Sequence, residues 1–177
     1  MKFTSQEEYG LRCVLGLARV TRGDADDPAA HTVAEIAARE GVSVQYVSRL
    51  FRLLGKAGIL ESVRGRKGGY RLTRSADEIT AAEILSALGG AIYKSDTCER
   101  FTGDRSFCVH TSDCSIRSLW SGLQHIVDLV LSRVTLGELI GGERSMAQWI
   151  DVHTEEIGVL HAGEGRGPSR YERPSGS

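Results

Sequence analysis

Residues 32–60, TVAEIAAREGVSVQYVSRLFRLLGKAGIL, limit the possible folds of this chain more than any other stretch. Thr32 and Glu35 have the spacing of a capping box, which predicts the start of a short helix. Gly41 is expected to end this helix, and Ser43 to cap a second one. A short helix, a glycine turn and a second helix form a helix-turn-helix, although an αα-hairpin with no DNA role gives the same pattern. Helical spacing is kept by the apolar residues Val44, Val47, Leu50, Phe51 and Leu54.

A glycine-rich hairpin is expected after the second helix. Two short strands, 59–63 and 70–72, flank the turn RGRKGG. The glycines of this turn permit positive φ and a close approach of the backbone to a phosphate or a narrow groove. Its three cations are attracted by the negative charge of either one. We therefore interpret the hairpin as the wing of a winged helix, with a solvent-exposed hairpin that has no partner as the alternative.

The distribution of charge favours contact with nucleic acid. The whole chain has a net charge of −1, yet residues 43–74 hold eight Lys/Arg and one Asp/Glu. Such a basic segment is typical of a surface that binds a phosphate backbone, and a solvated charged face is the alternative. The candidate DNA-binding residues are Ser43, Gln45, Tyr46, Ser48, Arg49, Arg52, Arg64, Arg66 and Lys67.

Two more helices are expected around this unit. Residues 5–20 are predicted to form a helix that begins at Ser5 as its cap and is apolar on two sides, so it should be packed from two sides. Cys13 lies within that apolar pattern and is interpreted as a buried core thiol. Residues 80–88 form a further predicted helix, with Thr80 and Glu83 as a capping box.

A long apolar stripe begins after Ser115 and is followed by a short helix at 135–140. A two-fold partner would cover this stripe, and DNA operators are commonly two-fold as well; packing onto its own domain is the alternative. The stripe consists of Ile116, Leu119, Trp120, Leu123, Ile126, Val127, Val130 and Val134. The expected domains are a winged helix-turn-helix (1–90), a cysteine-bearing sensor loop (91–114), a dimerisation helix with a short C-terminal helix (115–150) and a partly disordered tail (151–177).

Three cysteines, Cys98, Cys108 and Cys114, lie in the segment before the stripe. The chain has no apolar signal-peptide core and no run long enough to cross a membrane, so we expect a cytoplasmic protein. Disulfides are uncommon there, and clustered thiols more often bind metal or act in redox chemistry. The gaps of nine and five residues fit the tight spacing of zinc sites poorly.

An iron–sulfur cluster suits soft thiolates but takes four ligands. The candidates for the fourth position are Glu8, Asp104, His110 and Asp113. A zinc site and a thiol-only redox site remain alternatives. The chain shows no nucleotide-binding loop, nucleophile–base pair or paired-carboxylate pattern, so we expect no enzyme; a thiol redox enzyme is the less favoured class.

Residues 42–72, VSVQYVSRLFRLLGKAGILESVRGRKGGYRL, resemble the recognition helix and wing of the Rrf-two family of winged-helix transcription regulators, of the IscR and NsrR type. MKFTSQEEYGLR, ITAAEIL and the three-cysteine loop before a long helix ending in TLGELI extend this resemblance over roughly residues 1–141. It implies a mainly α fold with a small β-hairpin wing, in which a winged helix-turn-helix is followed by a long dimerisation helix. It also implies a homodimer on a double-stranded DNA operator.

The resemblance implies a cofactor as well. In many members three cysteines of the loop, here Cys98, Cys108 and Cys114, bind a 2Fe–2S or 4Fe–4S cluster, whereas other members lack them. Glu8 matches an acidic residue of NsrR-like members that reaches the cluster of the partner subunit. His110 is the rival, although the histidine of IscR-like members follows the last cysteine. The implied function is a DNA-binding regulator, expected to be a repressor, whose DNA affinity responds to redox state, nitric oxide or iron.

Overall fold

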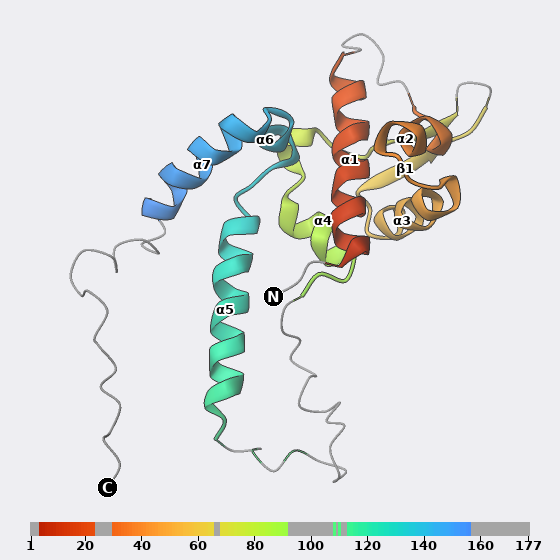
Figure 1. The fold of residues 1–177 in the computed structure, drawn as a ribbon. Helices are drawn as coiled ribbons and strands as arrows, with labels where there is room; N and C mark the ends of the chain where they lie inside the picture. Colours follow the sequence, from red (N-terminus) through yellow and green to blue (C-terminus); the bar gives the residue numbers. More distant parts are fainter. Residues whose placement is uncertain are drawn as a thin grey trace, which may run out of the picture.

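The computed structural model describes residues 4–23, 30–65, 68–91, 108, 110 and 113–156. Seven α-helices, a short 3-10 helix and a two-stranded antiparallel hairpin occur in this part of the chain, which confirms the predicted fold class (Figure 1). Arg66, Lys67, Cys98, Asp104 and residues 157–177, which figured in the predictions, lie outside the described residues. The elements are α1 (Ser5–Gly23), α2 (Val33–Glu40), α3 (Val44–Lys56), β1 (Leu60–Val63), β2 (Gly69–Leu72), η1 (Ala76–Glu78), α4 (Ala81–Ala87), α5 (Ser115–Leu131), α6 (Leu136–Ile140) and α7 (Glu143–Glu156).

The helix-turn-helix consists of α2 and α3, and its predicted capping residues are confirmed. The Thr32 side chain accepts a hydrogen bond from the backbone N–H of Glu35, whose carboxylate accepts one from the backbone N–H of Thr32. Gly41 ends α2 at a φ of 66° in the left-handed region, where a side chain would be strained. Ser43 caps α3 by accepting from the backbone N–H of Tyr46 at 3.3 Å.

The predicted hairpin is formed by β1 and β2, in a register that places Leu60 opposite Leu72. Its turn requires glycine for steric reasons, because a Cβ on Gly68 would lie 2.5 Å from the carbonyl oxygen of Val63. A Cβ on Gly69 would collide with the backbone of His31, which pairs with Tyr70 along the outer edge of β2. His31, two residues before α2, thereby fastens the hairpin to the helix-turn-helix.

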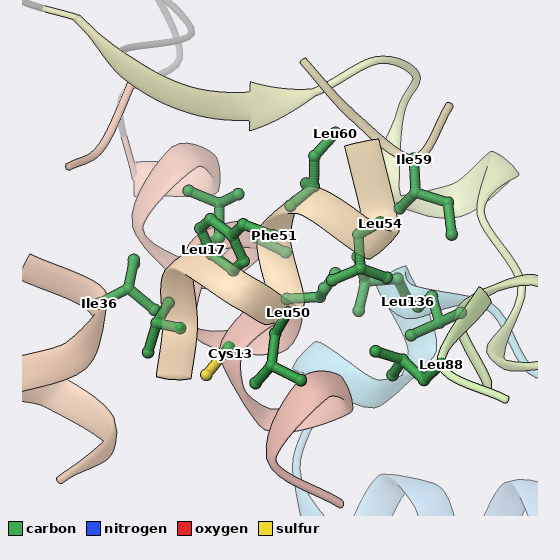
Figure 2. Packing of buried hydrophobic residues seen from close by; sticks show 14 of the residues in the cluster. Cys13, Leu17, Ile36, Leu50, Phe51, Leu54, Ile59, Leu60, Leu88 and Leu136 are labelled. Atoms are coloured by element: carbon green, nitrogen blue, oxygen red, sulfur yellow. The ribbon is translucent and has the colours of Figure 1, made fainter. Parts of the chain in front are cut away.

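The core surrounds α1, which has α2, α3 and β2 on one side and α4 and α6 on the other (Figure 1). The two apolar faces predicted for this helix are therefore both used. Figure 2 shows Phe51 of α3 next to Leu17 of α1, and Leu50 belongs to the same buried cluster. Cys13 is fully buried in the same cluster, as predicted.

Two details of the predicted helices were wrong. Ser5 does not cap α1: Thr4 does, because its hydroxyl accepts from the backbone N–H of Glu7 while the Glu7 carboxylate accepts from the backbone N–H of Thr4 at 2.8 Å. Val44 does not join the apolar face of α3 and is 46% exposed. It is the first residue of the helix.

No residue of α5 is buried, and Ile116, Leu119, Trp120, Leu123 and Ile126 of its stripe are exposed, although the helix also contacts α4. The helix ends at Leu131, earlier than the stripe predicted, and Val134 instead lies in the core with its carbonyl oxygen accepting from the backbone N–H of Ala81. After α6, the helix α7 continues past residue 150, where we placed the start of the tail. None of the helices in the described ranges combines the length and apolarity needed to cross a membrane.

Candidate nucleic-acid interface and cysteine segment

The outer face of α3 presents most of the candidate DNA-binding side chains. Gln45, Arg49 and Arg52 are exposed on it, while Tyr46 and Ser48 are half-buried. The ring of Tyr46 meets that of Tyr9 edge to face, with centroids 6.2 Å apart, so part of its surface is used in packing against α1.

The cations of the basic segment fall into two groups. Arg71 and Arg74 are neutralised, since they lie 2.6 Å from Glu61 and 2.7 Å from Glu83. Within the described residues, Arg49, Arg52 and Arg64 make no ion pair with an acidic side chain. Uncompensated positive charge is therefore concentrated on the recognition helix α3 and the base of the hairpin, the two elements that the winged-helix arrangement directs at DNA.

A link between α3 and two other elements was not predicted. The side-chain oxygen of Gln6 in α1 accepts a hydrogen bond from Arg49 Nη2 at 3.2 Å, and its side-chain nitrogen donates to the backbone oxygen of Leu88 at 2.6 Å. These partners are 43 and 82 residues from Gln6 in the sequence, so local patterns gave no signal for the contacts.

The cysteine segment joins the start of α5. Cys108 and Cys114 are half-buried free thiols. Cys114 caps α5, with its Sγ accepting from the backbone N–H of Arg117 at 3.4 Å, and Arg117 Nη2 donates to the backbone oxygen of His110 at 2.8 Å. The described part of the chain contains no cluster of three metal-ligating side chains.

The two acids at the start of α1 have different environments. Glu7 is buried at 8% exposure as the partner of Thr4 in the capping box. The Glu8 side chain is 59% exposed, and its closest cation is Arg12 at 4.0 Å. Glu8 is therefore accessible to a group outside this chain. The Glu7 carboxylate, in contrast, is used in the cap of α1.

Comparison with known proteins agrees with this architecture. A family model named Rrf2 and described as an iron-dependent transcriptional regulator matches residues 3–142. The chain belongs to the Rrf2 family. It is 32% identical over 140 residues to the HTH-type transcriptional regulator IscR of Vibrio atlanticus, which covers 79% of this chain and 75% of that protein.

Solved structures of Rrf2-type regulators have the same fold. CymR, the global cysteine regulator of B. subtilis, is 27% identical with a TM-score of 0.61, over 80% of this chain and 97% of that one. IscR of T. potens has a TM-score of 0.59 at 23% identity, over 94% of each chain, and this similarity supports the shared fold only. These relatives are transcriptional regulators, so this Rrf2 chain is a regulator and not an enzyme, as predicted.

One thiol of this Rrf2 chain stands apart from the cysteine segment. Burial, together with the nearby negative charge of Glu40, raises the pKa of Cys13 to about 11. A thiol is a poor nucleophile and ligand until it loses its proton, so Cys13 is a core residue and does not join the candidate ligands.

Proposed function

We propose that this chain is a homodimeric, DNA-binding repressor whose affinity for its operator is changed by an iron–sulfur cluster. The observation that carries the proposal is the extent of the family match. The family model, described as an iron-dependent transcriptional regulator, matches residues 3–142, a range that includes both the winged helix and the three cysteines. The chain therefore joins a DNA-binding unit to a set of soft ligands for iron, and such a regulator acts in the cytoplasm.

The DNA contact uses the face where positive charge is left uncompensated. α3 enters the major groove, where Gln45, Arg49 and Arg52 reach base edges and phosphates. Arg64, Arg66 and Lys67 of the wing meet the adjacent minor groove or backbone. Ser43 and Tyr46 lie at the start of α3 next to the backbone, and Ser48 lies on the same face.

The dimer is formed through α5. Ile116, Leu119 and Trp120 are 63%, 57% and 43% exposed, and Leu123 and Ile126 continue the apolar stripe. An exposed apolar face of this size on one helix marks a protein interface. A two-fold axis along it places one α3 on each half of a two-fold operator.

The donor set fits a cluster. Thiolates are the usual ligands of iron in such clusters, and Cys98, Cys108 and Cys114 supply three of them. The backbone N–H that reaches Cys114 Sγ is the kind of outer contact that tunes a metal-bound sulfur. Glu8 of the partner subunit completes the set, with His110 as its rival. A bound 2Fe–2S or 4Fe–4S cluster supplies a centre that reacts with oxidants or nitric oxide.

The metal content of anaerobically purified protein tests this assignment. We expect iron and sulfide in the wild type, loss of both in Cys108→Ala, and a less stable cluster in Glu8→Ala. His110→Ala tests the rival ligand and should keep its iron when Glu8 is the fourth ligand. Zinc in place of iron would contradict the cluster and support a structural metal site, while metal-free protein with full DNA binding would support a thiol-only redox site.

A further inference from the structure

Gln6 makes two side-chain hydrogen bonds to elements that meet at the start of α1. The first runs from its Nε2 to the backbone oxygen of Leu88 at 2.6 Å, and the second runs from Arg49 Nη2 to its Oε1 at 3.2 Å. Only this orientation of the amide serves both partners, because a carbonyl oxygen accepts and a guanidinium donates. The half-buried Gln6 side chain therefore connects α4 to α3 through a single amide.

The two partners of Gln6 lie in different parts of the proposed regulator: one precedes the cysteine segment and the other is on the DNA-binding face of α3. Leu88 is 2% exposed and ends α4, just before Gly89 at a φ of 93° and the segment that leads to Cys98. Arg49 is exposed on the outer face of α3 and has no acidic partner within the described residues. The end of α4 is thus tied to a cation of the recognition helix.

The contact leaves Arg49 available to DNA. A guanidinium has five N–H donors, and the bond to Gln6 uses one of them. Because Gln6 already holds one edge of the Arg49 guanidinium, this side chain loses less conformational entropy when it binds DNA. The buried backbone of Leu88 in turn fixes Gln6, so the direction of the guanidinium depends on the position of the end of α4.

We propose that Gln6 is a positioning residue that couples the start of the cysteine segment to the DNA-binding direction of Arg49. This inference rests on the proposed function, because it deepens the regulation of the same DNA contact. When the end of α4 holds its place, Gln6 presents Arg49 to a phosphate or a base edge. A displacement of Leu88 leaves the amide with one partner, and Arg49 then loses its fixed direction.

The variant Gln6→Met removes both hydrogen bonds and keeps the length and helix propensity of the side chain. We expect its DNA affinity to fall about three- to tenfold, which corresponds to the loss of one ordering hydrogen bond. The slope of log affinity against log salt should stay close to the wild-type value, because Arg49 keeps its charge and can still reach the DNA. The iron content, measured separately, should not change. Gln148→Met, on exposed α7, is the matched control and should change none of these quantities.

The regulatory part of the inference is tested by comparing loaded with cluster-free protein. In the wild type the two forms should differ in DNA affinity, and in Gln6→Met this ratio should shrink towards one. In an Arg49→Met background, Gln6→Met should have no additional effect on affinity. If Gln6→Met folds poorly, Gln6→Ala provides the same comparison without the longer side chain.

Two results overturn different statements. A wild-type protein whose DNA affinity does not depend on cluster loading contradicts the proposed function, and the inference fails with it. A wild type that switches normally, together with Gln6→Met that keeps the wild-type ratio and affinity, contradicts the inference alone.

Discussion

Arg12 of α1 donates from Nε to a carboxylate oxygen of Glu40 in α2 at 3.3 Å, which joins the central helix to the first helix of the helix-turn-helix. Its guanidinium also lies over the ring of Tyr9, 5.5 Å from the centroid, and 4.0 Å from Glu8. Among the described residues, the carboxylate proposed as a cluster ligand thus has only a distant ion-pair partner, while the shorter contact of Arg12 is with Glu40.

The Arg12–Glu40 pair should contribute little to stability. Half of the Arg12 side chain is exposed, and exposed ion pairs contribute up to about 1 kcal/mol to the free energy of unfolding. We expect Arg12→Met to lower that free energy by less than about 1 kcal/mol in urea denaturation, with a smaller difference at high salt. Loss of several kcal/mol would show that the pair is a structural requirement.

The three cysteines among the described residues should differ in reactivity. Cys13 is fully buried with a pKa raised to about 11, so it should resist alkylation by iodoacetamide at about pH 8 in the native protein. In cluster-free protein, the half-buried Cys108 and Cys114 should react first. Peptide mass spectrometry over time measures each site, and unfolded protein is the control in which Cys13 must react as well. Native Cys13 that reacts as fast as Cys108 would contradict the buried position.

Acid should weaken the cap of α4. The pKa of Glu83 is lowered, first by the backbone N–H of Thr80 and then by Arg74, from an ordinary value of 4.5. A lowered pKa in the folded state stabilises the protein above the ordinary value, and this contribution disappears as the pH falls through the folded pKa. Because Glu83 is 40% exposed, the contribution should be below about 1 kcal/mol.

The measurement for Glu83 is urea denaturation of wild type and Glu83→Gln between about pH 6 and pH 3. The two proteins should differ at the upper end of this range and converge at the lower end. Glu143→Gln in α7 is the control. A difference that grows as the pH falls would have the wrong sign and would reject the assignment.

The apolar stripe on α5 predicts which substitutions should disrupt the proposed dimer. Leu119→Lys should convert a dimer into a monomer, because it places a charge on an apolar face that is 57% exposed in one subunit. Ser121→Lys adds the same charge to the opposite face of the helix and should leave the dimer intact. Sedimentation velocity compares the two variants, and a Leu119→Lys protein that stays dimeric would move the interface away from α5.

The local elements could be predicted because neighbouring residues determine them. Thr32, Gly41 and Ser43 act within one turn of the backbone, and the structure confirms each. Thr4 and Ser5 each have an acid three residues later, Glu7 and Glu8, so both match a capping box. The spacing alone could not show that Thr4 and Glu7 form the cap, as the structure has it.

Contacts across the fold could not be predicted in the same way. Gln6 meets Leu88 and Arg49 only because α1 lies between α4 and α3, and nothing in its neighbours identifies these partners. Val134 has the spacing of the α5 stripe, but α5 ends at Leu131 and Val134 is buried in the core. The proposed ligand set includes Cys98, which lies outside the described residues, and Glu8 from the second subunit that we propose.

The central claim is that cluster loading changes DNA affinity, and fluorescence anisotropy with one operator DNA tests it most directly. The operator is selected from random DNA with the anaerobically purified protein, and affinity is then measured for that protein and for the same preparation after its cluster is removed. We predict at least about a tenfold difference at equal salt, within the usual range of coupling between two sites. Equal affinity of the two forms for that operator, at every salt concentration tested, would contradict the account.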